Sequence, residues 1–184
     1  IGEFYFGLLV LWLVLILAGS LFLKKRIITL IQRIKEPILL AFSTSSSEAA
    51  FPKTMLELER FGCKNKIVSF VLPLGYSFNL DGSMMYMTFA SLFIAQSYGI
   101  HLDFATQMSM LMVLMLTSKG IAGVPRASLV VIAGTLATFN IPEAGLALLL
   151  GIDPLLDMGR SATNVVGNSI ATAVVSKWEG DLES

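Results

Sequence analysis

Charge, cysteine and histidine are scarce in this 184-residue sequence, and each shortage excludes a class of protein. Charged residues make up 14% of the chain and hydrophobic residues 55%, whereas a soluble domain needs more charge to cover its surface. The single cysteine, Cys63, excludes an internal disulfide, and the single histidine, His101, gives a poor basis for a metal site. The formal net charge is zero, without the basic clustering of a nucleic-acid surface. We therefore expect a membrane protein without a cofactor or a nucleic-acid partner.

A long uncharged run near the start is the clearest membrane signal. Residues 4–23 contain no charged side chain and are numerous enough to cross a bilayer core of about 30 Å. Lys24, Lys25 and Arg26 follow at once, which predicts a cytoplasmic end for this span. A signal peptide carries its basic residues before the apolar run, so we interpret this run as a retained span. Because the chain begins at Ile1, we expect a fragment or a processed form.

Two later blocks share a plan of an apolar arm, a small polar tip and a second arm. The first tip is Ser-Thr-Ser-Ser-Ser at residues 43–47, and the second is Thr-Ser-Lys-Gly-Ile-Ala-Gly-Val-Pro at residues 117–125. Arms of roughly 10 to 15 residues are too short to cross a bilayer at about 1.5 Å per residue. Irregular backbone at membrane depth must meet protein or water. These blocks predict two re-entrant helical hairpins that enter from opposite sides.

The predicted fold is an all-α membrane protein, with transmembrane helices and two re-entrant hairpins arranged as an inverted repeat. The expected segments are a transmembrane helix at residues 1–26, a first hairpin at 27–63, a broken transmembrane helix at 64–98, a loop and second hairpin at 99–140, and a last transmembrane helix with a cytoplasmic tail at 141–184. A longer apolar segment with polar residues near its middle follows each hairpin, as a site at the membrane midplane requires.

The broken helix contains the sequence Asn79, Leu80, Asp81 and Gly82. Asn, Asp and Gly weaken helices and favour turns and caps, so the helix should unwind here. The freed carbonyls and two side-chain oxygens suit a monovalent cation. Alternatively, Asp81 is the N-cap of a second half-helix that begins at Gly82.

Four polar side chains share one helical spacing in the apolar C-terminal segment. They are Asp157, Arg160, Asn164 and Asn168, at i, i+3, i+7 and i+11. With 3.6 residues per turn, this spacing places all four on one stripe, and Ser161 lies beside it. A charged pair in a membrane helix is costly, so such residues usually face a bundle interior, a cavity or a ligand path. The stripe is therefore a candidate binding site.

The charged members of the stripe allow two interpretations. Arg160 can donate two parallel hydrogen bonds to a carboxylate. Asp157, one turn earlier, either pairs with Arg160 as a structural ion pair or accepts hydrogen bonds from a substrate ammonium.

The two tips add further candidates. Ser46 and Ser47 present hydroxyls and backbone donors near helix termini, which suits an anion, although most serine runs are ordinary loops. Lys119, at the second tip, would be the base in an intramembrane serine hydrolase. The sequence lacks the other features of such a site, so we expect no enzymatic activity.

The segments 43–47, 79–82, 120–125 and 157–164 together resemble the signature segments of the dicarboxylate/amino acid:cation symporter family. That family includes glutamate and aspartate transporters and bacterial C4-dicarboxylate carriers. The resemblance implies that the chain corresponds to the sixth span, the first hairpin, the seventh span, the second hairpin and the eighth span of an eight-span protein. It also implies a multi-pass protein of the bacterial cytoplasmic (inner) membrane, surrounded by lipid, which forms homotrimers through scaffold spans that precede this chain.

The resemblance also implies substrate-binding roles. Arg160 would hold the side-chain carboxylate of the substrate and Asp157 its amino group. Asn164 and the backbone around Ser46 and Ser47 would hold the main carboxylate. Because a C4-dicarboxylate has no amino group, the presence of Asp157 favours an acidic amino acid.

Four more residues complete the implied site. Gly123 and Val124 would close the second gate, and Ser83 and Ser161 would line the site. In this family the hairpin tips act as gates, and the transport domain crosses the membrane like an elevator.

Three positions differ from the sodium-coupled relatives. Asn168 stands where those relatives carry an acidic sodium ligand, so the charge that favours a cation is lost. Lys119 and Ile121 stand where they carry an uncharged residue and a threonine near another sodium. A lysine ammonium there would repel sodium or replace it. These departures lead to the hypothesis of proton coupling.

The identity of the proton carrier is left open by the sequence. Asp81 and Glu48 are the candidates, because burial without a cation favours a protonated carboxyl group. Eukaryotic relatives use a suspected glutamate on the seventh span, where this chain has Met87. The alternative coupling ion is sodium, held at Asn79, Asp81 and Asn164.

The function expected from these residues is symport of glutamate or aspartate with protons by elevator-type alternating access. The alternatives within the family are a C4-dicarboxylate or cystine symporter and sodium-coupled glutamate transport. An anion channel would also use Arg160 and two gates, but it would carry flux without coupling.

Overall fold

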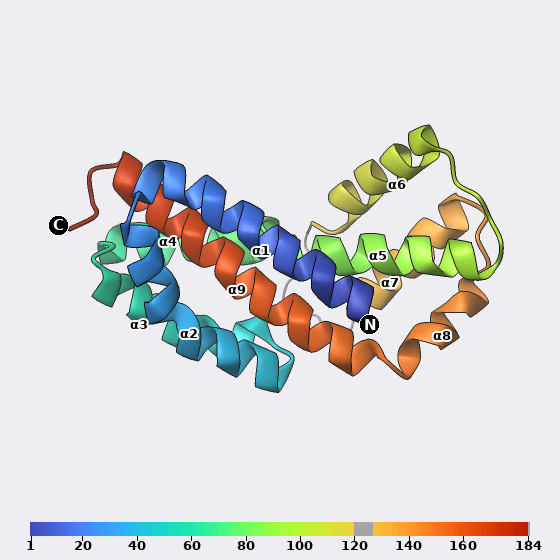
Figure 1. Ribbon diagram of the computed structural model, residues 1–184, viewed down its shortest axis with the longest axis horizontal. Coiled ribbons are helices and arrows are strands. Elements are labelled where there is room, and N and C mark those ends of the chain that lie inside the picture. The colour runs from blue at the N-terminus through green and yellow to red at the C-terminus, as the bar shows by residue number, and fades with distance from the viewer. Residues whose placement is uncertain (120–126, 184) are drawn as a thin grey trace.

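The computed structural model describes residues 1–119 and 127–183. The secondary structure of these ranges is helical, with turns and one isolated antiparallel bridge between Cys63 and Leu182. The elements, labelled in Figure 1, are α1 (Gly2–Leu23), α2 (Arg26–Thr44), α3 (Ser47–Phe61), α4 (Asn65–Phe78), α5 (Asp81–Ser97), α6 (Phe104–Thr117), α7 (Ala127–Thr138), the 3-10 helix η1 (Glu143–Gly145), α8 (Leu146–Leu150) and α9 (Asp153–Trp178). The predicted all-α class is confirmed.

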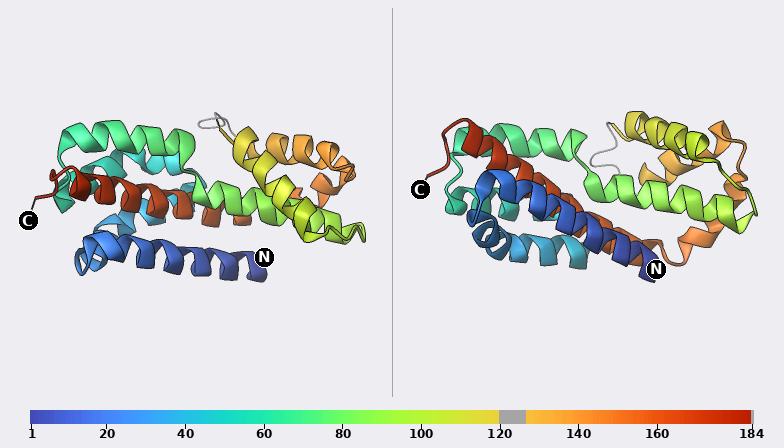
Figure 2. Two further views of the ribbon diagram at one scale, coloured as in Figure 1. Left: turned by 90° about the horizontal axis from the view of Figure 1, so that it is seen from above. Right: turned by 45° about the horizontal axis from the view of Figure 1, so that its top comes forward.

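Helix α9 is the axis of the molecule. It packs against α1, α2, α3, α4 and α5. Figure 1 shows α1 alongside it, α2 to α4 around its C-terminal half, and α5 to α8 at its N-terminal end. The views in Figure 2 show the same division into two ends. All ten residues from 161 to 170 are buried, so α9 is covered on every side where the polar stripe lies.

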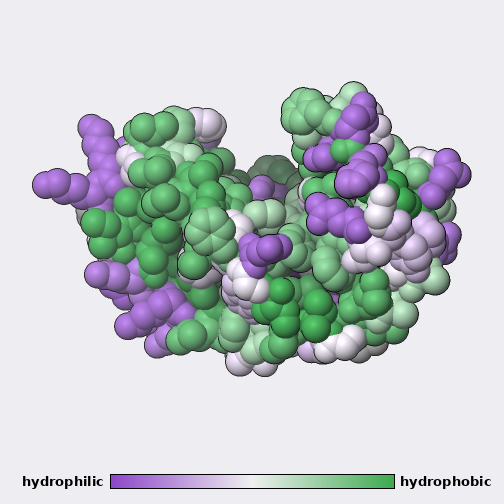
Figure 3. All heavy atoms as spheres, turned by 45° about the vertical axis from the view of Figure 1, so that its right-hand side comes forward, coloured by the Kyte–Doolittle hydropathy of each residue, from purple (hydrophilic) through white to green (hydrophobic). Residues whose placement is uncertain are grey.

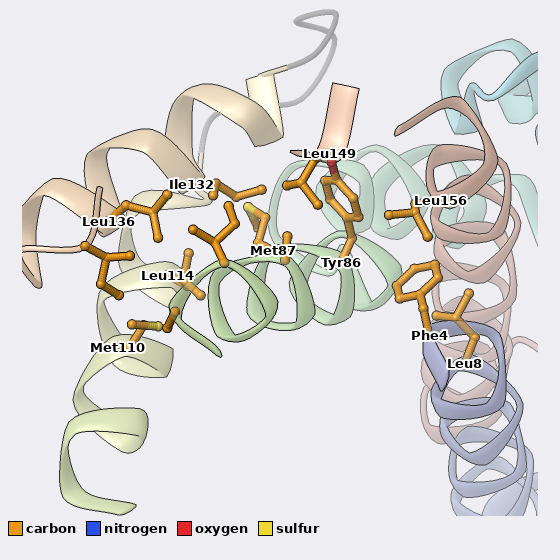
Figure 4. Close-up of a cluster of buried hydrophobic side chains, with 14 residues drawn as sticks. Phe4, Leu8, Tyr86, Met87, Met110, Leu114, Ile132, Leu136, Leu149 and Leu156 are labelled. Atoms are coloured by element: carbon orange, nitrogen blue, oxygen red, sulfur yellow. The ribbon is translucent and has the colours of Figure 1, made fainter. Parts of the chain in front are cut away.

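Two hydrophobic clusters stabilise the two ends of the molecule. One joins α5 to α6, α7, α8 and the first turns of α1 and α9, and includes Phe4, Met87 and Ile132 (Figure 4). The other joins α2, α3 and α4 to the far halves of α1 and α9, and includes Leu30 and Ile170. Full burial of one such side chain contributes about 1.5–3 kcal/mol. Each helical hairpin therefore has its own core, and α9 takes part in both.

Helix α1 leaves a long apolar stripe uncovered. Among the described residues it is the one helix long and apolar enough to cross a membrane, with 22 residues. Its exposed side chains include Phe6, Leu13 and Leu21, which are 69%, 57% and 78% exposed. Figure 3 shows hydrophobic residues over much of the molecular surface, with hydrophilic residues mostly toward the ends. A helix on the surface of a soluble protein would bury such a stripe.

The first arm of the first hairpin is longer than predicted. The expected length was roughly 10 to 15 residues, and α2 has 19. The helix continues into the polar tip because Ser43 and Thr44 donate their hydroxyls back to the carbonyl of Leu40, at 3.1 and 2.7 Å. These bonds satisfy a helix-terminal acceptor and hold the last turn.

The last long helix begins later than predicted. The expected segment started at residue 141, but α9 begins at Asp153, after η1 and α8. Pro154 lies in the first turn of α9. Proline lacks the backbone N–H needed inside a helix and is favoured in the first turn. A helix that ran through this position from residue 141 would lose a backbone hydrogen bond at Pro154.

After α9, the chain folds back onto the loop between α3 and α4. We call residues 179–183 the C-terminal clasp. Lys64 N donates to the carbonyl of Asp181 at 3.2 Å, and Glu183 N donates to the carbonyl of Gly62 at 2.9 Å. The clasp thereby ties the end of α9 to the base of the first hairpin.

The clasp should loosen at acidic pH. The Asp181 carboxylate lies 2.6 Å from Nζ of both Lys64 and Lys66. The Lys64 ammonium, and next that of Lys66, hold the pKa of Asp181 below its ordinary value. The contribution to stability is therefore full above the unfolded carboxyl pKa of about 4, and is lost as pH falls through the lower folded value.

This pH dependence can be measured by hydrogen exchange at the amides of Lys64 and Glu183. In the full-length protein that contains this chain, we expect both amides to be protected at pH 7 and to lose protection below about pH 4. Asp181→Asn should reduce the protection of both amides at pH 7 and make their protection less dependent on pH. Unchanged protection in this variant would contradict the role given to the carboxylate.

Candidate functional site

The helix break predicted at Asn79 to Gly82 is confirmed. α4 ends at Phe78 and α5 begins at Asp81, with Asn79 and Leu80 between them. The interpretation of Asp81 as an N-cap is wrong, because Leu80 is the N-cap and makes no side-chain capping bond. Asp81 is the first residue of α5 itself.

The cap of α5 comes instead from α9. Oδ1 of Asn164 accepts hydrogen bonds from Gly82 N at 2.9 Å and Ser83 N at 3.2 Å, and Nδ2 of Asn164 donates to Ser83 Oγ at 3.1 Å. All three residues are buried. The amide therefore satisfies two of the backbone donors left free at the start of α5, as a local capping side chain would.

Glycines allow the helix break to approach α9 closely. A Cβ at Gly82 would overlap the carbonyl oxygen of Arg160 and lie 2.9 Å from Cβ of Thr163. A Cβ at Gly167 would overlap the Asp81 carboxylate. Both positions must therefore lack a side chain for the start of α5 to rest on the polar stripe.

A second polar layer lies one turn beyond Asn164. Nδ2 of Asn79 donates to Oδ1 of Asn168 at 3.2 Å, and a Cβ at Gly75 would lie 2.5 Å from that same oxygen. Oδ2 of Asp81 and Nδ2 of Asn168 are buried and have no hydrogen-bond partner among the described residues. Buried groups of this kind usually have partners, so this layer has the capacity to hold a proton or a small ligand.

Arg160 joins α9 to the second hairpin. Nη1 donates to Ser128 Oγ on α7 at 2.7 Å, and Nη2 forms an ion pair with Asp157. The side chains of Arg160 and Asp157 are 19% and 23% exposed, so this ion pair is neither fully buried nor in free solvent. Nε of Arg160 and Oγ of Ser161 are buried without a partner among the described residues. The ion pair expected as one alternative is present, and the guanidinium keeps a free donor beside it.

The first tip is held by its own hydroxyls. Ser46 is the N-cap of α3, and its Oγ accepts from Ala49 N at 3.2 Å. The hydroxyls of Ser46 and Ser47 also donate to Oε2 of Glu48, at 3.3 and 3.4 Å. The carbonyl of Ser47 accepts from the Tyr76 hydroxyl on α4 at 3.0 Å. These bonds fix the tip against α4.

The tip also packs beside the polar stripe. Ala41 of α2 and Ala50 of α3 form a small buried cluster with Val165 of α9. Val165 directly follows Asn164, so the first tip lies next to the residue that caps α5.

The second tip is described only at its start. Lys119 Nζ donates to the carbonyl of Phe78, the last residue of α4, at 2.6 Å. Lys119 also interacts electrostatically with Asp81. The predicted gate residues Gly123 and Val124, and Ile121, lie outside the described residues. Lys119 therefore supplies a positive charge where the helix break leaves a free carbonyl.

A comparison with known protein families identifies the family of this chain. Residues 1–178 match the sodium:dicarboxylate symporter family. This chain belongs to that family. The resemblance carried by the four sequence segments is thereby confirmed, and the chain is part of a membrane transporter family.

Individual relatives within the symporter family carry two kinds of name. A proton/sodium-glutamate symport protein of Geobacillus stearothermophilus is 56% identical over 151 residues, which are 82% of this chain and 36% of the relative. One of Bacillus subtilis is 53% identical over 146 residues, 79% of this chain and 34% of the relative. A C4-dicarboxylate transport protein of Agrobacterium fabrum is 48% identical over 184 residues, 100% of this chain and 41% of the relative. The chain thus spans less than half the length of these symporter-family relatives.

The described part of this symporter-family chain offers no obvious metal centre. No group of three or more His, Cys, Asp or Glu side chains within residues 1–119 and 127–183 could hold a metal ion.

Sequence reasoning missed three contacts that α9 makes with other helices. Ser128 binds Arg160, as described above. The Tyr86 hydroxyl donates to Oδ1 of Asp153 at 2.5 Å, and both residues are buried. Trp12 Nε1 donates to Thr163 Oγ1 at 2.8 Å and ties α1 to α9. Asp153, directly before Pro154, could be recognised in the sequence as an acidic residue at a helix start. Its partner Tyr86, 67 residues away, could not be recognised in this way.

Proposed function

We propose that this chain is the substrate-binding part of a secondary symporter that moves glutamate or aspartate with protons across a bacterial inner membrane. The observation that carries the proposal is the environment of Arg160. Its guanidinium lies between Asp157 on α9 and Ser128 on α7, and its Nε has no hydrogen-bond partner among the described residues. A planar cation with a free donor suits a substrate carboxylate, and Asp157 beside it can accept from a substrate ammonium.

The proposal includes the arrangement in the membrane. The pairs α2–α3 and α6–α7 are the re-entrant hairpins, and the separate hydrophobic core of each supports an inverted repeat. The rest of the site would be Asn164, Ser161, Ser83 and the backbone at Ser46 and Ser47. The homotrimer and the elevator movement depend on parts of the protein outside this chain.

Proton coupling is supported by the chemistry of the second polar layer. Asn168 is neutral, and Lys119 places a positive charge at the end of α4. A sodium ion there would meet like charge. Asp81, with a buried oxygen that lacks a described partner, is the first candidate for the proton. Glu48, bound by the tip hydroxyls of Ser46 and Ser47, is the second.

A C4-dicarboxylate substrate is the second candidate. It is favoured by relatives named as C4-dicarboxylate transport proteins that match the whole chain. Asp157 argues against it, because a dicarboxylate offers no ammonium to this carboxylate. Competition of labelled aspartate uptake by excess glutamate or excess succinate separates the two candidates.

The coupling ion is tested by uptake of radiolabelled L-aspartate into proteoliposomes that contain the full-length protein. Inward proton and sodium gradients are imposed separately. We expect a proton gradient alone to drive uptake, and Asn168→Asp to make uptake depend on sodium, because a second carboxylate would lie near Asp81. A requirement for sodium in the unmodified protein would overturn proton coupling.

A further inference from the structure

We propose that the cytoplasmic ends of α1 and α9 form a binding site for the headgroup of an anionic phospholipid. A surface cavity of about 460 Å³ lies between these ends. Its lining includes four cationic side chains, Lys24, Lys25, Arg26 and Lys177, and no carboxylate. The chain as a whole is neutral, with 13 basic and 13 acidic residues, so this concentration of positive charge is local.

Three of the four cations are available to a ligand. Lys24, Lys25 and Lys177 are exposed and form no ion pair with any described residue. Arg26 is held in place, because its Nη1 donates to Glu183 O at 2.6 Å and its Nη2 to Phe61 O at 3.0 Å.

The acidic side chains of the clasp do not line the cavity, and neither Glu179 nor Glu183 forms an ion pair with a described residue. The carboxylate of Asp181 is already bound by Lys64 and Lys66, at 2.6 Å each. The three lysines that line the cavity, Lys24, Lys25 and Lys177, are therefore available to bind an anion. Two or more ammonium groups around one cavity suit a phosphate group, which offers several acceptor oxygens.

The apolar part of the lining favours a lipid over free phosphate. Phe22, Leu23 and Leu182 complete the cavity. The Phe22 and Trp178 rings meet edge to face with centroids 5.1 Å apart, and are 41% and 66% exposed. Exposed aromatic rings next to basic residues at the end of a span are typical of the membrane interface, where anionic headgroups lie.

The backbone between α1 and α2 positions the basic residues. Lys24 has φ +52° and closes α1, and α2 begins two residues later at Arg26. The chain reverses within this turn, so Lys24 and Lys25 stay at the end of α1 and do not extend away from the membrane. Lys177, in the last turn of α9, then faces the same cavity.

A second charged groove on the first hairpin provides the control. This groove, of about 500 Å³, is lined by cations that include Arg33 and Lys35, but also by Glu36 and Glu57. Its carboxylates pair with Lys53 at 2.7 and 3.9 Å, and Glu57 also pairs with Arg60 at 2.8 Å, so two of its four cations are paired within the protein. Arg33→Gln/Lys35→Gln removes two positive charges, as many as Lys25→Gln/Lys177→Gln. Neither Arg33 nor Lys35 lines the proposed lipid site.

The test is native mass spectrometry of the full-length protein titrated with phosphatidylglycerol or phosphatidylcholine. We expect phosphatidylglycerol to bind more tightly, and Lys25→Gln/Lys177→Gln to weaken it by roughly tenfold to thirtyfold, with little effect on phosphatidylcholine. Arg33→Gln/Lys35→Gln should leave binding within about twofold of the unmodified protein.

Three outcomes would overturn the proposal. They are equal affinity of the unmodified protein for both lipids, an equal loss in the control variant, and full displacement of phosphatidylglycerol by millimolar inorganic phosphate. The last would assign the cavity to a free anion. Because lipid binding is measured without transport, the result is independent of the proposed substrate and coupling ion.

Discussion

Arg160→Cys in the full-length protein should abolish uptake of acidic substrates. The guanidinium is the cation on α9 that faces both Asp157 and the second hairpin, and a cysteine cannot replace its charge or its paired donors. Truncating one partner of a fully buried, hydrogen-bonded charge pair costs about 2–5 kcal/mol, and because this pair is partly exposed we expect a loss near the lower end, roughly thirtyfold in affinity. Neutral amino acids have no side-chain carboxylate for the guanidinium to bind, so we expect the variant to admit them.

The measurement is uptake of labelled aspartate, glutamate and serine by proteoliposomes under one imposed gradient. Arg33→Cys is the matched control, because Arg33 is an exposed arginine on α2, away from the stripe. The control should retain uptake of the acidic substrates. Acidic uptake by Arg160→Cys at near-normal affinity would show that Arg160 does not bind the substrate carboxylate.

Gly82→Ala should strongly destabilise the full-length protein. The added methyl group would overlap the carbonyl oxygen of Arg160, which belongs to the α9 backbone and cannot rotate away. Overpacking of a tight interior costs about 1–3 kcal/mol and occasionally more, and a fixed backbone obstacle puts this site at the upper end. Moving α5 to relieve the overlap would also strain the bonds that Asn164 makes to Gly82 and Ser83.

Thermal stability of the detergent-solubilised protein tests this prediction. Gly134→Ala is the matched control, because a Cβ at this position on α7 meets no atom within 4 Å. Alanine is also the better helix former by about 1 kcal/mol, so the control should be neutral or slightly stabilising. Equal melting temperatures for Gly82→Ala and the unmodified protein would contradict the close approach of α5 and α9.

The sequence predicted features that depend on local spacing. The 3.6-residue period placed Asn164 and Asn168 on one face of a helix, and both meet the helix break in the structure. The break itself followed from three weak helix formers within four residues, Asn79, Asp81 and Gly82. The start of α9 was missed because an apolar run was extended through Pro154, whose effect is also local and could have been recognised.

Other features depend on contacts between distant segments and could not be predicted from patterns. Asn164 lies 82 residues from Gly82, and no spacing rule reports that one caps the helix of the other. The contact of Ser128 with Arg160 joins α7 to α9, which are likewise distant in the sequence. The clasp was missed because its hydrogen bonds use backbone groups, which every residue carries.

The cap that Asn164 gives to α5 has a consequence for ligand binding. Its oxygen is already engaged by two backbone donors, and one of its two Nδ2 hydrogens by Ser83. A ligand carboxylate can take the remaining hydrogen without disturbing the helix. A ligand that drew Asn164 further away would leave the first amides of α5 unbonded, at a cost of about 1 kcal/mol. Only a ligand that displaces the Asn164 amide would therefore disorder the first turn of α5, so this one amide links the position of a ligand on α9 to the order of a second helix.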